Sequence, residues 1–210
     1  MRNKFTIKTK DLLVANGQVV MSESERPFLE LLFSRLAHLR PATVLEVGFG
    51  LGVSARLIQR YLRPKFHDVV EIDRTIYRDL RDYAQGRRGI SAILGDFWSF
   101  RAPRCYDFIF YDPFDYYDGD PTADVDEDYD REKASRMAKL LEADGTVCCP
   151  SFGKDTPEPM PGFRRSFYEV CKVPPYLLDI GTVTTTGAIV CWQQKKTPCP
   201  SRKPHPHVDH

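Results

Sequence analysis

Residues 44–52, Val-Leu-Glu-Val-Gly-Phe-Gly-Leu-Gly, constrain the fold of this chain more than any other stretch. They begin as a largely apolar run with β-branched and leucine side chains, which is typical of a buried parallel strand. Glycines at alternate positions follow, and these permit backbone dihedrals and close approaches that a Cβ atom would forbid. A helical pattern covers residues 53–61. A strand, a tight turn and a helix start in this order predict a site for a nucleotide-like cofactor.

The glycine spacing distinguishes two kinds of cofactor. A dinucleotide-binding turn needs Gly-x-Gly-x-x-Gly, which brings a helix N-terminus against a pyrophosphate. Here the glycines are Gly48, Gly50 and Gly52, and position 53 is valine. Glu71 follows about 20 positions later at the end of the next strand-like run, where a carboxylate can accept hydrogen bonds from ribose hydroxyls. The pattern favours an adenosine cofactor without a pyrophosphate.

Strand and helix patterns alternate through the first half of the chain. Residues 67–73, 91–94 and 106–111 resemble strands, and residues 74–85 a helix. A further helix through residues 134–141 and a fifth strand at 146–149 are predicted. This alternation is typical of βαβ units, which build a mostly parallel sheet that is covered on both faces. The predicted fold class is therefore α/β.

The two ends of the chain carry their own signals. Ser22 and Glu25 have the spacing of a capping box, so a helix is expected to start near Ser22 and to stop at Pro41. Near the C-terminus we predict a helix over residues 164–170 and an antiparallel hairpin whose runs, 176–180 and 188–192, flank the turn 184–187. We expect one domain over residues 1–196, with residues 1–40 as an N-terminal segment and substrate-capping helix, and a flexible tail over 197–210.

Composition excludes several functions. Thirty basic and 29 acidic residues leave a net charge of +1, so no global field favours nucleic acid or an anionic membrane as partner. Six cysteines occur without a Cys-x-x-Cys pair and are expected to be reduced core residues. No apolar leader or membrane-length run is present, so we expect a cytoplasmic protein. No metal site is predicted, because His205, His207 and His210 of the tail lack a partner cluster.

The segment Glu46-x-Gly48-x-Gly50-x-Gly52 resembles the first motif of class I S-adenosylmethionine-dependent methyltransferases. The resemblance runs from about residue 42 to 195 and implies a Rossmann-like fold, in which a mostly parallel seven-stranded sheet ends in a C-terminal antiparallel hairpin. It implies S-adenosyl-L-methionine as cofactor, with Glu46 and the glycine turn at the methionine moiety, Glu71 at the ribose, and Asp96 with Phe97 at the adenine. The cofactor-binding residues expected are Glu46, Gly48, Gly50, Gly52, Glu71, Ile72, Asp96, Phe97 and Asp112.

Further segments resemble the guanidinoacetate N-methyltransferase family, in the same order and with similar gaps. They are residues 17–27, residues 44–50, Trp98 and residues 106–112. The resemblance implies that Glu25 and Asp112 bind a guanidino group. After Asp112 the chain departs from the family, because residues 112–130 carry nine acidic side chains and no Lys or Arg. This stretch is either a lid for a cationic or amphipathic acceptor, lined by Phe114, Tyr116 and Tyr117, or a solvated loop.

The chemistry of a guanidino group suits two carboxylates. A guanidinium is planar and pairs bidentately with carboxylates, so two of them can fix its plane. It is a poor nucleophile because its pKa exceeds about 12, and a carboxylate that accepts its proton restores a lone pair. We assign this role to Asp112, with Glu25 as clamp; the alternatives are that Glu25 only caps a helix and that Asp112 only starts a loop. The catalytic residues expected are Asp112 and Glu25, and the substrate-binding residues are Glu25, Met21, Tyr111, Phe114 and Tyr116.

The function predicted is N-methylation of a small guanidino or amino metabolite. Three alternatives remain open: aminopropyl transfer of the spermidine synthase kind, O- or N-methylation of another small natural product, and a non-catalytic cofactor-binding subunit. The first shares the sheet and a segment that resembles residues 106–112. A homodimer is one further option that the sequence leaves open.

Overall fold

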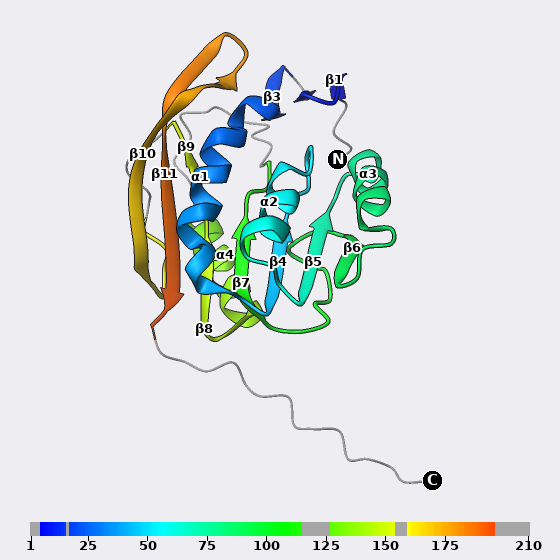
Figure 1. Ribbon diagram of the computed structural model, residues 1–210. Helices are drawn as coiled ribbons and strands as arrows, with labels where there is room; N and C mark the ends of the chain where they lie inside the picture. The colour runs from blue at the N-terminus through cyan, green and yellow to red at the C-terminus, as the bar shows by residue number, and fades with distance from the viewer. Residues whose placement is uncertain (1–4, 16, 115–126, 154–158, 196–210) are drawn as a thin grey trace.

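A computed structural model describes residues 5–15, 17–114, 127–153 and 159–195 (Figure 1). In these ranges eight strands form the main sheet, in the order β10-β11-β8-β7-β4-β5-β6, with β9 beside β11. Strands β4 to β8 are parallel, whereas β10 and β11 are antiparallel. Their bounds are β4 (Thr43–Val47), β5 (Phe66–Glu71), β6 (Ile90–Leu94), β7 (Tyr106–Tyr111), β8 (Leu141–Cys148), β9 (Ser151–Phe152), β10 (Phe163–Asp179) and β11 (Thr182–Gln194). The predicted Rossmann-like sheet with its C-terminal hairpin is confirmed, with the short β9 added.

Helices cover both faces of this sheet. On one face lie α1 (Arg26–Leu36), α2 (Val53–Tyr61) and α3 (Arg74–Ala84), and on the other α4 (Glu127–Leu140) (Figure 1). Each face has its own core: Leu32 and Ile58 pack on the first, and Met137 and Val147 on the second. Three of the five side chains of β4 are apolar and fully or almost fully buried, namely Val44, Leu45 and Val47, as expected for a strand that is covered on both faces.

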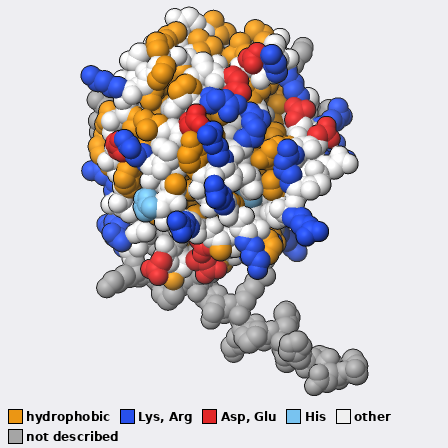
Figure 2. All heavy atoms as spheres, in the orientation of Figure 1, with side chains coloured by type: hydrophobic (Ala, Val, Ile, Leu, Met, Phe, Trp, Pro, Cys, Tyr) orange, Lys and Arg blue, Asp and Glu red, His pale blue; other side chains and the backbone are white. Residues whose placement is uncertain are grey.

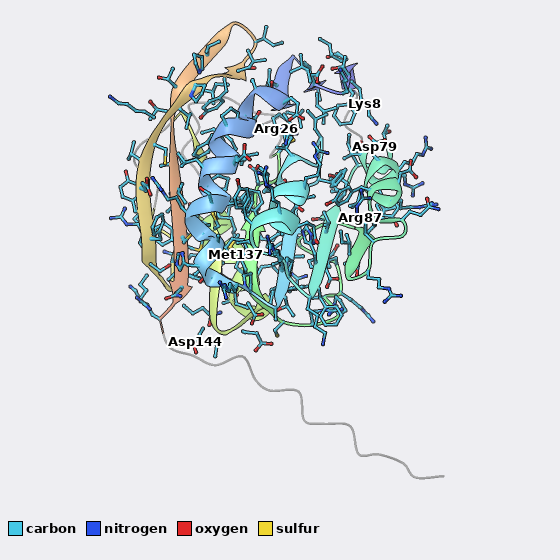
Figure 3. All side chains as sticks on the ribbon, viewed as in Figure 1. Lys8, Arg26, Asp79, Arg87, Met137 and Asp144 are labelled. Carbon is cyan, nitrogen blue, oxygen red and sulfur yellow. The ribbon has the colours of Figure 1, made fainter. Side chains whose placement is uncertain are left out.

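A small three-stranded sheet lies over the carboxyl ends of the parallel strands (Figure 1). Its strands are β1 (Phe5–Lys8), β2 (Leu12–Ala15) and β3 (Gln18–Ser22). Lys8 forms an ion pair with Asp79 of α3 (2.6 Å), and Asp179 of β10 accepts from the backbone N–H of Val19 (3.2 Å), so the small sheet is attached at two sides (Figure 3). The sequence indicates only the last of these three strands, because the apolar triplet at residues 19–21 follows an Asn-Gly turn signal and is typical of a short extended segment.

The predicted helix start near Ser22 is confirmed in its detail. The hydroxyl of Ser22 accepts from the backbone N–H of Ser24 (3.2 Å), and Glu25 accepts from that of Ser22 (2.8 Å). These bonds close a capping box around the 3₁₀ turn η1 (Glu23–Glu25), which leads directly into α1. A second 3₁₀ turn, η2 (Ala37–Leu39), ends the helical stretch before Pro41.

Two predictions near the C-terminus are wrong. Residues 164–170 form part of β10 instead of a helix, because they pair along β11, with Tyr168 opposite Val190. The hairpin turn lies at Ile180 and Gly181, where Gly181 has a φ of +75°, and residues 184–187 belong to β11. Gly187 has a packing role there, since a Cβ atom would lie 2.7 Å from the ring of Phe28.

The start of β8 and the state of the cysteines can also be compared with the predictions from the sequence. Helix α4 ends at Leu140, and β8 begins at Leu141, five residues before the predicted strand. The cysteines in the described part of the chain are free, as expected, and Cys148, Cys171 and Cys191 are buried. Tyr116, Tyr117 and the predicted tail lie outside the described residues. Within the described ranges, no helix combines the length and hydropathy that a bilayer-spanning segment needs.

Candidate active site

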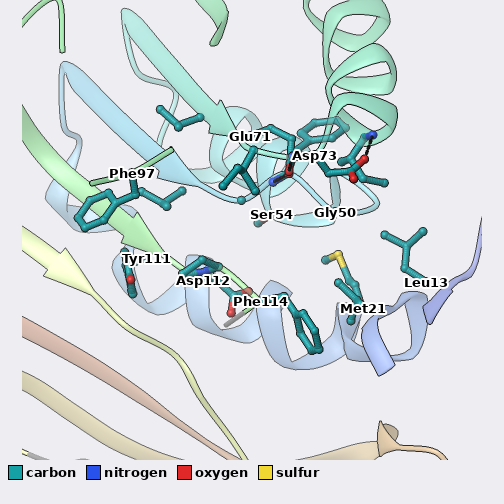
Figure 4. A pocket seen from close by; sticks show the side chains of 18 of the residues that line it. Leu13, Met21, Gly50, Ser54, Glu71, Asp73, Phe97, Tyr111, Asp112 and Phe114 are labelled. Carbon is teal, nitrogen blue, oxygen red and sulfur yellow. Dashed lines mark hydrogen bonds between the residues drawn. The ribbon is translucent and has the colours of Figure 1, made fainter. Parts of the chain in front are cut away.

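A cavity of about 540 Å³ opens at the carboxyl ends of the parallel strands (Figure 4). One wall is formed by the glycine turn after β4, the end of β5 and the loop after β6. The opposite wall comes from β3 and η1, from the residues after β7, and from β9 and β10. Since the loops at the carboxyl ends of parallel strands converge on one edge, this is where such sheets bind ligands.

The glycine turn is packed directly against both sides of the cavity. Gly48 has a φ of +89°, and a Cβ atom there would lie 2.9 Å from the carbonyl oxygen of Asp112. Gly50 has a φ of +52°, and a Cβ atom there would lie 2.5 Å from the sulfur of Met21. That sulfur accepts from the backbone N–H of Leu51 (3.1 Å). Glycine is therefore required both by the backbone conformation and by the approach of Asp112 and Met21.

Glu71 is fixed at the end of β5 by two backbone hydrogen bonds. Its Oε2 accepts from the N–H of Phe49 (3.0 Å) and its Oε1 from that of Asp73 (2.7 Å). The residue is almost fully buried, and burial raises the pKa of its carboxyl group above the usual range. Each oxygen keeps a second lone pair, so the carboxylate can still accept from two adjacent hydroxyl groups.

The loop after β6 carries the predicted adenine residues. Asp96 accepts from the backbone N–H of Trp98 (2.9 Å). The ring of Phe97 packs edge-on against Trp98 and Tyr111, with centroids 5.3 and 5.0 Å away. Ile72 lies at the cavity with most of its side chain exposed. These groups form a flat apolar slot beside an acceptor, as a purine ring requires.

Arg136 of α4 holds this loop in place, although sequence reasoning did not identify it. Its guanidinium donates to the carbonyl oxygens of Phe97 (3.0 Å) and Phe100 (2.6 Å) and lies over the ring of Phe100. No local motif marks such a residue, because its partners belong to a different element.

Glu46 does not line the cavity, although sequence reasoning placed it at the methionine moiety. It is fully buried, and the hydroxyl of Ser54, which does line the cavity, donates to it. Its second oxygen lies 3.0 Å from Nε2 of His67, whose Nδ1 is hydrogen-bonded to Gln59 (3.1 Å). A carboxylate inside a buried strand needs polar partners. The position of Glu46 in an apolar strand was therefore the only sequence feature that could have predicted such partners.

The two predicted catalytic carboxylates lie in the same cavity. Glu25 is only 8% exposed, and its burial raises the pKa of the carboxyl group to about 8. Asp112 follows β7, and its pKa lies well above the usual range because of burial and the nearby negative charges of Glu25 and Glu46. Glu25 both closes the capping box and lines the cavity, so the two interpretations of its sequence position are compatible.

The other predicted substrate residues are placed as follows. Met21, Tyr111 and Phe114 line the cavity, whereas Tyr116 lies outside the described residues. Sequence reasoning missed Phe152 of β9 and three residues of β10 that complete this wall. These three are Tyr176, Leu177 and Leu178. These three residues lie in the predicted run 176–180, but the sequence pattern did not show that this end of the hairpin reaches the cavity.

This cavity fits an adenosyl group joined to an amino acid. The turn at Gly48 and Gly50 forms a cradle for the amino-acid part, which a Cβ atom at either position would fill. The fixed carboxylate of Glu71 suits the vicinal hydroxyls of a ribose, and the apolar slot at Phe97 suits a purine. The fold and the site together define a class I S-adenosylmethionine-dependent methyltransferase. The family model of guanidinoacetate N-methyltransferase matches residues 4–149, and the chain belongs to that family. Its cofactor, S-adenosylmethionine, supplies a methyl group activated on a sulfonium.

Solved structures show the same fold. The N-methyltransferase NodS from Bradyrhizobium japonicum WM9, in complex with S-adenosyl-L-homocysteine, aligns with a TM-score of 0.59 at 15% identity, over 83% of this chain and 88% of that chain. TrmN from Thermus thermophilus aligns with a TM-score of 0.53 at 18% identity, over 83% of this chain and 49% of that chain. A search of curated protein sequences gave no match.

Proposed function

We propose that this methyltransferase acts on a nitrogen of a small guanidino or amino compound, which Glu25 and Asp112 bind. One observation carries the proposal: two carboxyl groups with raised pKa values face the same cavity beside the glycine turn. Among the described residues that line this cavity, none is Lys, Arg or His. A cationic acceptor is the ligand that this arrangement favours.

The electrostatics of the pair explain why a cation would bind. In the empty cavity each carboxyl group retains its proton to a higher pH than usual, mainly because burial disfavours the charged form, and the charges of Glu25 and Glu46 add to this effect at Asp112. A guanidinium offers five N–H donors in one plane and can donate to both carboxylates at once. Its charge lowers both pKa values again, so binding releases protons and orders the acceptor.

Each carboxylate has a distinct role in this proposal. Glu25 is held by its bond to the backbone of Ser22 and orients the acceptor. The backbone of Asp112 lies against Gly48 of the cofactor cradle, and its side chain lines the same cavity. As the acceptor nitrogen is methylated it loses one proton, and Asp112 accepts it. A raised proton affinity suits a general base that works near neutral pH.

The remaining residues bind and position the cofactor. Glu71 accepts from the ribose hydroxyls, and Asp96 and Phe97 hold the adenine. The N-terminus of α2, directly after the glycine turn, has a partial positive charge that suits the methionine carboxylate. Glu46 is a positioning residue that acts through Ser54.

The test is turnover on a panel of guanidino and amine compounds, followed as formation of S-adenosylhomocysteine. The variant Asp112→Asn keeps the shape of the side chain and loses the base, so kcat should fall by about 10²- to 10⁴-fold. Affinity for S-adenosylhomocysteine should change little. Asp79→Asn, at an exposed ion pair with Lys8, is the matched control and should behave as wild type. Full activity of Asp112→Asn, or turnover only on alcohols, contradicts the proposal.

A further inference from the structure

The acceptor side of the cavity has a hydrocarbon wall. Opposite the glycine turn, the residues that form it are Val20, Phe114, Phe152, Tyr176, Leu177 and Leu178. The charged side chains among the described lining residues are all carboxylates, namely Glu25, Glu71, Asp73, Asp96 and Asp112. This wall therefore has no positively charged side chain, within the described residues, that could pair with an anionic group of the acceptor.

Three neutral donors near this wall already have partners, namely the N–H groups of Gly153 and Leu177 and the hydroxyl of Tyr176. The backbone N–H of Gly153 donates to the hydroxyl of Tyr176 (3.1 Å) and to the carbonyl oxygen of Thr186 (3.0 Å). The Tyr176 hydroxyl itself donates to Thr186 (2.7 Å), and the N–H of Leu177 donates to Ser24 (3.0 Å). A carboxylate placed here would lose its hydration without gaining a hydrogen bond from these groups.

The two acceptor-binding carboxylates make such a placement worse. An acidic tail on the acceptor would lie near Glu25 and Asp112, and like charges in a poorly solvated cavity repel strongly. The stretch that follows Phe114 adds no compensation in its composition, because residues 115–126 contain no Lys or Arg. An alkyl or aryl tail, in contrast, gains by leaving water along this wall.

The apolar wall continues to the surface of the protein. Leu178 is 36% exposed, and Ile180 and Val183 at the tip of the β10–β11 hairpin are 58% and 60% exposed. Figure 2 shows hydrophobic side chains gathered at the top of the molecule, where this hairpin ends. A tail longer than the cavity would therefore meet further apolar surface.

We propose that the acceptor is an amphipathic cation, with a guanidinium or ammonium head and an alkyl or aryl tail that has no carboxylate. This inference rests on the proposed function, since Glu25 and Asp112 hold the head. The residues that select the tail are Phe114, Phe152 and Leu178.

A matched pair of acceptors tests the tail. Guanidinoacetate and isobutylguanidine share the head and one methylene group, and an isopropyl group replaces the carboxylate in the second. We expect kcat/KM at least tenfold higher for isobutylguanidine, and higher again for phenethylguanidine. Equal or greater activity with guanidinoacetate overturns the inference and leaves the proposed function intact. If no guanidino or amine compound accepts a methyl group although S-adenosylhomocysteine binds, the proposed function itself fails.

Substitutions locate the selectivity on this wall. Leu178→Arg places a cation at the partly exposed edge of the wall and should shift the ratio of kcat/KM at least tenfold toward guanidinoacetate. Val170→Arg, at an exposed position of the same strand and away from the cavity lining, is the control and should leave the ratio unchanged. An unchanged ratio in Leu178→Arg overturns the assignment of this wall.

Discussion

At Glu25 a single carboxylate serves the fold and the cavity together. Its Oε1 accepts from the backbone of Ser22, which completes the cap that starts the helical stretch. The same side chain is almost buried and faces Asp112 across the cavity. A cap alone would be satisfied by glutamine as well as by glutamate, so in the proposed function the negative charge is the part of this residue that binds the acceptor.

Glu25→Gln separates these two roles. The amide oxygen keeps the cap, whereas the charge is lost, so the stability near pH 7 should not decrease. A hydrogen bond to a charged group contributes about 1.5–3 kcal/mol, which predicts a rise in KM for a guanidino acceptor of roughly 10- to 100-fold. Steady-state kinetics and thermal melting measure the two effects. Glu23→Gln, whose side chain pairs with Arg26 and Arg56, is the matched control. An unchanged KM in Glu25→Gln would show that this carboxylate does not bind the acceptor.

The sequence could predict residues whose role follows from their own element. Glu71, Asp96 and Asp112 each follow a recognisable strand, and the carboxyl ends of parallel strands meet at one edge, so their convergence was predictable. Ser54 and His67 are different, because they matter only through Glu46, and spacing along the chain does not reveal which buried group they contact.

Among the elements, α4 acts on the cofactor site from outside it. Arg136 reaches from this helix to two carbonyl oxygens of the loop after β6, and the loop in turn carries Asp96 and Phe97. The N–H of Gly95 fixes the start of this loop by donating to the carbonyl oxygen of Glu71 (3.0 Å), and Arg136 holds the part that follows, so we expect the helix to contribute to the order of the proposed adenine site.

Arg136→Met tests this role of α4. The thioether can still cover the rings of Phe97 and Phe100, but both donors to the loop are lost, so S-adenosylhomocysteine should bind about tenfold more weakly. Isothermal titration calorimetry measures the affinity. Lys139→Met makes the same change at an exposed position of the same helix and should bind normally. The preference among acceptors should be retained in both variants. Unchanged affinity in Arg136→Met would mean that the loop is fixed by other contacts.

Elements buried on both faces were predicted well, whereas the edge hairpin was not. Strand β7 was predicted with its observed bounds, because a short and mostly apolar run of this kind is typical of a strand that is buried on both faces. Residues 164–170 lie at the sheet's edge, where one face is open and alternation is weak; Tyr168 and Val170 are both exposed there. Their strand conformation comes from pairing with β11, which is a tertiary property.

At the scale of the whole molecule, the cavity is acidic although the chain as a whole is nearly neutral. The net charge of +1 gives no strong field outside the protein, so a cation is attracted only close to the cavity. The negative charge is concentrated where the acceptor binds, and it is also poorly solvated. Ionisation of these buried carboxyl groups therefore lowers the free energy of unfolding of the whole domain.

That cost predicts how stability depends on pH. The pKa of Glu25 is raised from 4.5 to about 8 in the folded protein, and those of Glu71 and Asp112 are raised in the same direction. Between these two values the folded state binds more protons than the unfolded chain, so the free energy of unfolding decreases as pH increases. The stabilisation is fully present below pH 4.5 and is lost as pH approaches about 8.

Urea unfolding between pH 5 and 8 measures this slope, and Glu25→Gln should flatten it because glutamine does not titrate. At pH 8 the variant should be more stable than wild type, although it binds the acceptor less well. A guanidino acceptor should stabilise wild type more strongly as pH rises, since its charge offsets the carboxylates that deprotonation exposes. Equal slopes in wild type and Glu25→Gln would mean that Glu25 is ionised throughout this range and that burial does not raise its pKa.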